Sequence, residues 1–229
     1  MHSDSSDNSD NSANKKAART AGLWYLAFTL LGAFSYLAVD AKLLTPGDAA
    51  ATLDNITSNL TLFWLGFATL LAGYGCFVML AMALRKLFRP VNIALGNLMM
   101  VFVLAGIVIV LLGRTACVAA LYETEINNAS RYFAFQADAE MAAGVFWGLW
   151  LIPLGLLILK SNLIPNAIGI LALAAGVCNL AVSGLYFLAP EQLAAVLPAL
   201  TAAGMVGEFS LILWLLIKGV KQADARRRF

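Results

Sequence analysis

Residues 90–113 read PVNIALGNLMMVFVLAGIVIVLLG, a run of 24 residues without one charged side chain. An α-helix rises about 1.5 Å per residue, so a run of this length crosses the roughly 30 Å hydrocarbon core of a bilayer. The whole chain is 61% apolar and only 12% charged, against about 25% charged in ordinary soluble domains. The run therefore predicts a membrane-spanning helix.

Similar apolar runs occur on both sides of it. They lie at residues 21–39, 60–84, 141–159, 161–190 and 192–217, and the last is interrupted once, by Glu208. No segment alternates with period two over the length that a transmembrane β-barrel needs. The predicted fold is an all-α integral-membrane bundle of six helices over residues 21–220. Residues 21–39 are longer than a signal-peptide core of about 7–15 residues, so we expect this helix to be retained.

The basic residues predict the orientation of the bundle. Twelve Lys and Arg residues fall on the side of the two termini and three (Lys42, Arg114 and Arg131) on the other, and cytoplasmic loops retain positive charge. We expect both termini in the cytoplasm of a bacterial cell, with the protein in the inner (plasma) membrane. Residues 1–20, rich in Ser, Asp and Asn, predict a disordered cytoplasmic tail, and residues 221–229 a basic one. The external loops are net acidic and include Asp40, Asp48, Asp138, Glu140 and Glu191.

The first external loop predicts a short helix of its own. Thr45 followed by Pro46 reads as an N-cap with proline at the first helical position. Ala49, Leu53 and Ile56 then fall on one helical face, so a short interfacial helix should lead into the second span.

Several classes of site are excluded by composition. The chain has one histidine, His2, so haem ligation, an HExxH zinc site and His-activated nucleophiles are ruled out. No GxxxxGK[ST] motif is present, and no basic stripe with aromatics predicts nucleic-acid binding. Three scattered cysteines predict no disulfide scaffold. We expect no metal and no cofactor, and the residues favour a protein that is not an enzyme.

Glu208 is the leading candidate for a functional residue. It lies ten residues before Lys218, which places it about 15 Å along the helix and near the bilayer midplane. A carboxyl group there is costly, so it is neutral or paired. A role in function and a structural hydrogen bond to a neighbouring helix both stay open; Arg114 is the nearest cationic candidate and lies at the outer end of the third span.

Polar side chains on two other spans could meet Glu208. Asn179, at a similar depth, begins a stripe with Ser183 and Tyr186, and Tyr36 belongs to a stripe on the first span. Each stripe is consistent with ordinary interhelical hydrogen bonds or with a shared cavity. Trp147 could line a pocket or fill the core.

The fourth span carries a packing signal. Gly144 and Gly148 form a GxxxG pair, and Gly155 follows on the same face, so a close helix contact is predicted. Pro153 lacks the donor to the carbonyl of Leu149 and should kink the helix.

The chain resembles an uncharacterised bacterial membrane family, the domain of unknown function numbered 4386. The similarity covers nearly everything from Gly22 onward. It lies in residues 45–52 (TPGDAAAT) with Asn55-Ile56, in residues 146–155 (FWGLWLIPLG) with 160–161 and 164–165, and in 207–208 (GE) with 213–219 (LWLLIKG). The resemblance implies a multi-pass helical inner-membrane protein and supplies no reaction.

Three functional hypotheses follow. The first is a bundle that binds or passes a small or lipophilic ligand at Glu208, and the second is an accessory subunit or homo-oligomer that docks a membrane protein through the Gly144 and Gly148 face. The third is an enzyme that modifies lipid. A polar cavity that reaches Glu208 would favour the first hypothesis, and a solid core with an exposed glycine groove the second.

Overall fold

The computed structural model describes the backbone of residues 3–221 and the side chains of residues 14–221. Within this range the chain forms helices and no strand. In chain order the elements are α1 (Ser3–Ala33), the π-helix η1 (Phe34–Asp40), α2 (Ala41–Leu43), α3 (Ala49–Ser58), α4 (Leu60–Phe88), α5 (Ile93–Ala120), α6 (Ile126–Leu149), α7 (Leu151–Ser161), α8 (Asn166–Leu188) and α9 (Pro190–Ile217). Six helical stretches in this part of the chain are long and apolar enough to cross a membrane, which confirms the predicted all-α fold with six such helices.

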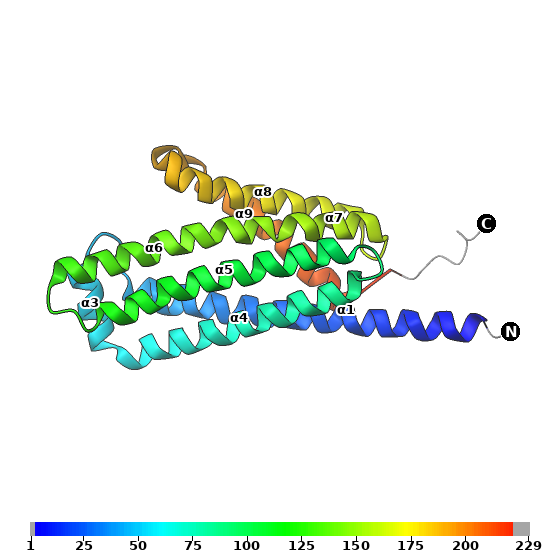
Figure 1. Ribbon diagram of the computed structural model, residues 1–229, viewed down its shortest axis with the longest axis horizontal. Coiled ribbons are helices and arrows are strands. Elements are labelled where there is room, and N and C mark those ends of the chain that lie inside the picture. Colours follow the sequence, from blue (N-terminus) through cyan, green and yellow to red (C-terminus); the bar gives the residue numbers. More distant parts are fainter. Residues whose placement is uncertain (1–2, 222–229) are drawn as a thin grey trace.

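By their contacts the long helices form a ring in chain order, and Figure 1 shows them running roughly along the long axis of the molecule. α1 contacts α4, α4 contacts α5, α5 contacts α6, the pair α6 and α7 contacts α8, and α8 contacts α9. α9 returns to α1 and closes the ring. Gly22 permits this closure, because a Cβ atom there would lie only 3.0 Å from the Cβ of Leu215. Close approach at small residues is how helices associate in lipid, where the hydrophobic effect gives no drive.

The two ends of the ring are filled differently. At the end that holds the α4–α5 and α7–α8 loops, large side chains pack into one core. Its fully buried members include Leu80, Leu84, Phe88, Leu154, Leu157 and Ile158. A smaller cluster, built on Val39, Leu43, Ile56, Phe63 and Cys117, closes the other end around η1 and α3. The space between the two clusters is therefore the part of the ring that side chains can leave open.

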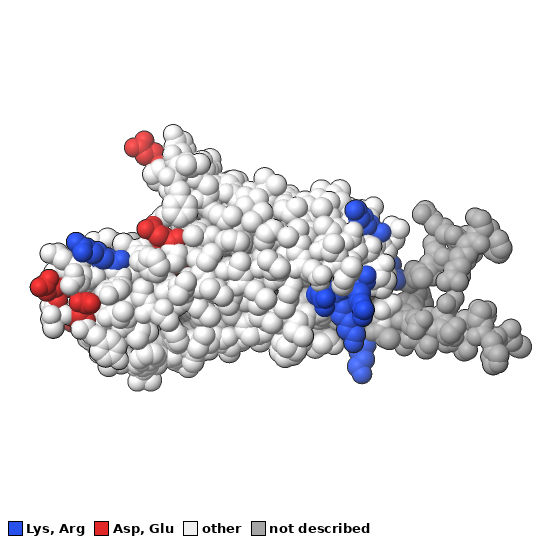
Figure 2. All heavy atoms as spheres, viewed as in Figure 1, with Lys and Arg blue, Asp and Glu red and all other residues white. Residues whose placement is uncertain are grey.

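Charge separates along the long axis of the ring. Figure 2 shows most basic side chains gathered at one end, and the acidic ones toward the other, where some basic charge is also present, with the sides nearly free of charge. Arg85 and Lys86, near the end of α4, and Lys160, near the end of α7, belong to the basic end. An uncharged band between two charged ends is the surface expected of a protein that spans a bilayer.

α5 and α6 extend further than the apolar runs predict. α5 continues past residue 113 to Ala120, and α6 begins at Ile126 instead of near residue 141. Arg114, expected at the outer end of the third span, and Glu140, counted with the external loops, therefore both lie inside helices. Near Pro153, for which a kink is predicted, the helix assignment is interrupted only at Trp150, between α6 and α7, and the Trp150 backbone stays in the right-handed helical region (φ −68°, ψ −28°). The Leu154 amide still reaches the Trp150 carbonyl at 3.4 Å.

The predicted short helix in the first loop is confirmed as α3, but its start is corrected. Asp48, and not Thr45, is the N-cap, and its Oδ1 accepts from the Ala51 amide at 2.9 Å. Thr45-Pro46-Gly47 forms a turn in which Gly47 has φ +79°, a conformation that glycine adopts without strain. The turn is tied to α3 because the Thr45 amide donates to the Thr52 hydroxyl at 2.9 Å.

The N-terminal segment differs from the predicted disordered tail of residues 1–20. α1 begins at Ser3, and Ala18 is fully buried against the bundle. Arg19 donates to the Ile217 carbonyl at 3.2 Å, so this part of α1 lies against the end of α9. Of the predicted basic tail 221–229, only Lys221 falls within the described residues.

Candidate functional site

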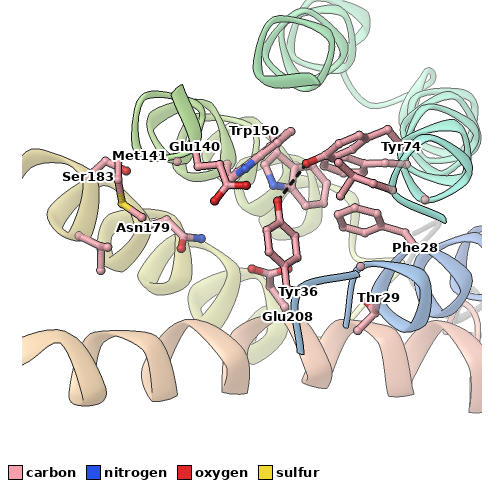
Figure 3. A pocket seen from close by; sticks show the side chains of 17 residues that line it. Phe28, Thr29, Tyr36, Tyr74, Glu140, Met141, Trp150, Asn179, Ser183 and Glu208 are labelled. Atoms are coloured by element: carbon pink, nitrogen blue, oxygen red, sulfur yellow. Dashed lines mark hydrogen bonds between the residues drawn. The ribbon is translucent and has the colours of Figure 1, made fainter. Parts of the chain in front are cut away.

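The open part of the ring is a cavity of about 420 Å³, called the chamber below. Its walls come from α1, η1, α4, α6, α8 and α9, together with Trp150 at the α6–α7 break. Figure 3 shows Glu208, Asn179 and Tyr36 pointing into the same space from three of these elements. A polar chamber that reaches Glu208 is the condition that favours ligand binding over docking in the sequence analysis.

Glu208 contributes the carboxyl group at the α1–α9 side of the chamber. Its Oε2 accepts a hydrogen bond of 2.8 Å from the hydroxyl of Tyr25, which is fully buried. No Lys, Arg or His among residues 14–221 lies within ion-pair distance of Glu208. The fourth residue before it, Gly204, has nothing within 4 Å of a Cβ position, so α9 leaves room on the outer side of the carboxyl group.

α8 supplies two more polar groups. Asn179 and Ser183 lie one turn apart and both face the chamber. Ser183 fits there because Gly144 on α6 has no side chain: a Cβ atom at Gly144 would clash with the Ser183 hydroxyl oxygen. The absence of a side chain at Gly144 therefore lets the Ser183 hydroxyl reach the chamber and lets α6 and α8 pack closely.

Aromatic rings form most of the opposite wall. The lining includes Phe28, Tyr36, Tyr74, Phe77, Trp147 and Trp150. The rings hold one another in place: Phe28 and Phe77 stack at 4.4 Å between centroids, and Tyr74 stacks on Trp147 at 6.0 Å. The hydroxyl oxygens of Tyr36 and Tyr74 lie 3.3 Å apart. The chamber wall thus combines aromatic rings and hydroxyl groups.

Arg114 joins three elements at the outer end of the chamber. Its guanidinium group forms a two-pronged contact with the Asp40 carboxylate of η1, with one bond of 2.9 Å. It also lies 2.6 Å from Oε1 of Glu140 on α6. The same group lies over the Tyr36 ring at 5.2 Å from the centroid. Bidentate pairing of this kind fixes geometry as well as charge, so Arg114 holds η1 and α6 in register.

A second cavity of about 470 Å³, called the outer cavity below, adjoins the chamber. The two share Tyr36, Glu140 and Met141 in their walls. The outer cavity lies against the Thr45-Pro46-Gly47 turn and the start of α3. Tyr186 lines this cavity instead of the chamber, and its hydroxyl donates to Asp138 at 3.1 Å.

Comparison with known proteins identifies the family of this chain but no individual relative. The family model for a domain of unknown function, DUF4386, matches residues 20–219, most of the chain. The chain belongs to the DUF4386 family. No curated protein and no solved structure matches it. The resemblance stated in the sequence analysis is therefore confirmed.

The structure places two of the DUF4386-like segments at the chamber. Residues 146–155 contribute Trp147 and Trp150 to its wall, and residues 207–208 contribute Glu208. The third segment, residues 45–52, lies at the outer cavity. Each of these three segments thus contributes residues to one of the two cavities.

Five of the six candidate ligand-binding residues of this DUF4386 protein meet in one place. Tyr36, Trp147, Asn179, Ser183 and Glu208 line the chamber, whereas the sixth, Tyr186, lies outside it. The aromatic wall from α4 and the Arg114 contacts were missed. The sequence did hint at the Arg114 contacts. Asp40 ends the polar stripe of the first span, and Glu140 lies one turn before Gly144 on the fourth, so both acids lie on helix faces that were expected to turn inward.

The predicted glycine row of the fourth span packs inside the same chain. A Cβ atom at Gly148 would lie 2.7 Å from the Gly176 carbonyl oxygen, and one at Gly155 would lie 2.9 Å from the Gly169 carbonyl oxygen. α8 therefore covers the row that was considered as a docking face for another protein. Pro153, on the neighbouring turn, is itself buried.

Among the described residues, no group of three His, Cys, Asp or Glu side chains could hold a metal ion. The acidic groups near the chamber are Glu208, which bonds to Tyr25, and Asp40 and Glu140, which share Arg114. The arrangement offers a carboxyl group, an amide, hydroxyls and aromatic faces, a set suited to holding an organic molecule.

Proposed function

We propose that this DUF4386 member is a multi-pass membrane protein that binds a small, partly apolar molecule in the chamber, with Glu208 as the central polar group. The observation that carries the proposal is the chamber itself, a cavity of about 420 Å³ inside a ring of apolar helices. Ligand pockets of about 300–1,000 Å³ with apolar walls and a few placed polar groups are typical of small-molecule sites.

The chemistry of the lining supports the same proposal. Phe28, Trp147 and Trp150 give apolar area, while Asn179, Ser183 and Glu208 give hydrogen-bonding groups on the facing helices. Polar groups inside a membrane are costly and are kept where they meet a partner or line a route. A ligand with an apolar body and one polar end would satisfy both sides of the chamber.

The glycine row argues against docking as the main role. α8 covers Gly144, Gly148 and Gly155 within the chain, so this face offers no groove to a second protein. The polar chamber, in contrast, is open. Binding within the ring is therefore the hypothesis that we carry forward.

Native mass spectrometry of the protein, extracted with its own lipids, tests the proposal. Gly32 lines the chamber and has nothing within 4 Å of a Cβ position, so Gly32→Leu should fill the chamber without a clash. Gly75→Leu is the matched control, because Gly75 is exposed on α4 and also has open space around it. We expect a bound small molecule on the wild type and on Gly75→Leu, and its loss from Gly32→Leu. Absence of any such molecule, or its equal retention by both variants, would count against binding in the chamber.

We further propose that both termini face the cytoplasm across a bacterial inner membrane. The support is the basic end of the ring (Figure 2), where Arg85 and Lys86 near the end of α4 and Lys160 near the end of α7 lie, since positively charged loops stay on the cytoplasmic side.

Single cysteines in a background without the native cysteines test this orientation. With an impermeant thiol reagent on intact cells, we expect labelling at Asp48→Cys and Glu125→Cys and none at Asn11→Cys or Lys221→Cys until the cells are opened. The reverse pattern would mean that the bundle is inverted.

A further inference from the structure

The chamber joins a carboxyl group without a cationic partner to a wall of aromatic rings. The Tyr25 hydroxyl donates a hydrogen bond to Glu208, and no basic side chain of the described residues forms an ion pair with it. Tyr74 and Trp147 stack elsewhere in the chamber wall. Aromatic faces carry negative potential and attract cations, most strongly where water is excluded. A carboxylate and several aromatic rings around one space therefore all favour a positively charged ligand.

Among the described residues, no Lys, Arg or His lines the chamber. The nearest one, Arg114, is buried, and both of its terminal nitrogens contact the carboxylates of Asp40 and Glu140. Two carboxylates around one guanidinium leave this group with a formal charge of −1. Arg114 therefore neutralises neither Glu208 nor the outer end of the chamber.

The outer cavity has the same sign of charge. Asp40, Asp48 and Glu140 lie in its wall, and no Lys or Arg does. Because it meets the chamber at Tyr36, Glu140 and Met141, acidic groups lie along the space from the α3 turn to Glu208. Walls of one sign around a low-dielectric space raise the local concentration of the opposite charge.

Building on the proposed function, we propose that the ligand of the chamber is a small organic cation, an ammonium group that carries apolar substituents, and that it enters through the outer cavity. The ammonium group lies between the Glu208 carboxylate and the faces of Tyr74 and Trp147. The apolar substituents lie against Phe28 and Trp150. A metal cation does not fit this lining, because hard cations need several oxygen ligands around one point and the rings occupy most of the wall.

A neutral ligand would use the same chamber differently. Glu208 could then be a carboxylic acid that donates a hydrogen bond, and the charge of the ligand would not affect its affinity. A pair of molecules that differ only in charge separates these two cases. Benzyltrimethylammonium and its neutral carbon analogue neopentylbenzene are such a pair, since one nitrogen is replaced by carbon at the same shape.

The experiment is calorimetric titration of both probes into the detergent-solubilised full chain, with Gly32→Leu as the blank for partition into micelles. For the wild type we expect the cation to bind at least roughly tenfold more tightly than neopentylbenzene. Glu208→Gln should reduce this ratio to about one, while it keeps an acceptor for the Tyr25 hydroxyl. Glu191→Gln is the matched control, because Glu191 is an exposed acid of the same helix and lines neither cavity; it should leave the ratio unchanged.

The outcomes separate this inference from the function on which it rests. Equal binding of the two probes by the wild type overturns the cationic ligand and leaves a binding chamber. A preference that survives undiminished in Glu208→Gln overturns the placement of the ammonium group at Glu208. Binding of neither probe, together with no co-extracted molecule in native mass spectrometry, overturns both. If Glu208→Gln fails to fold, the wild-type ratio alone decides the question.

Discussion

Arg114→Gln is expected to lower the free energy of unfolding by about 3–5 kcal/mol, the usual cost of removing one partner from a buried ion pair. The guanidinium group is the only cation that pairs with Asp40 and Glu140 among the described residues. Without it two carboxylates face each other across η1 and α6 in a low dielectric. The loss should appear as a lower melting temperature of the detergent-solubilised protein.

Two comparisons make this result specific to the ion pairs. Arg131 is exposed at the start of α6, so Arg131→Gln should leave the melting temperature nearly unchanged. Replacing the carboxylates as well, in a triple variant with Asp40→Asn and Glu140→Gln, should recover part of the stability, because neutral groups need no cation. An Arg114→Gln variant as stable as Arg131→Gln would mean that the three groups are not paired in the folded protein.

Gly148→Leu is expected to destabilise the protein by roughly 3 kcal/mol, at the upper end of the cost of overpacking. A Cβ atom at Gly148 would lie 2.7 Å from the Gly176 carbonyl oxygen and 3.0 Å from the Leu180 amide nitrogen. Both are backbone atoms of α8, so only a shift of the whole helix relieves the contact. Extracted yield and melting temperature should both fall.

Gly96→Leu is the matched substitution on another helix. A Cβ atom there meets Cγ of Arg85 at 3.3 Å, and a long flexible side chain can move aside, so we expect a cost of about 1 kcal/mol or less. Equal tolerance of the two substitutions would contradict the close packing of α6 against α8.

The six helices could be predicted because the bilayer imposes one simple requirement. A helix must hold about 20 apolar residues to cross it, and residues 90–113 meet this requirement without any knowledge of their neighbours. The ends of the helices follow no such rule. α6 begins 15 residues before the apolar run, at Ile126, since a helix that leaves the hydrocarbon tolerates polar residues.

Part of the chamber was visible in the sequence and part was not. The depth of Glu208 and Asn179 along their helices follows from counting residues, and the chamber brings both together. Which rings of α4 face the same space depends on the rotation of that helix, and α4 is apolar on every side. Its sequence therefore does not distinguish Tyr74 from the ring of Trp64, which is exposed on the outer surface.

The contacts of Arg114 show the limit of reading charges as loop markers. A charge at the end of an apolar run can mark the membrane surface, or it can turn inward to meet a partner at the same depth. Arg114 turns inward, toward Asp40 of η1 and Glu140 of α6. These partners are 74 and 26 positions away in the chain, so only the order of the helices around the ring brings them together.

The central claim is that the ring holds a chamber that small molecules can enter. Reactivity of a cysteine placed in the chamber tests it most directly, in a background without the native cysteines and with the small permeant reagent methyl methanethiosulfonate. Asn179→Cys should react at least roughly tenfold faster than Ala172→Cys, because Ala172 is buried on the same helix outside the chamber. Addition of Gly32→Leu should remove most of this difference. Equal and slow reaction at both positions, unaffected by Gly32→Leu, would show that the ring is solid and would contradict the account.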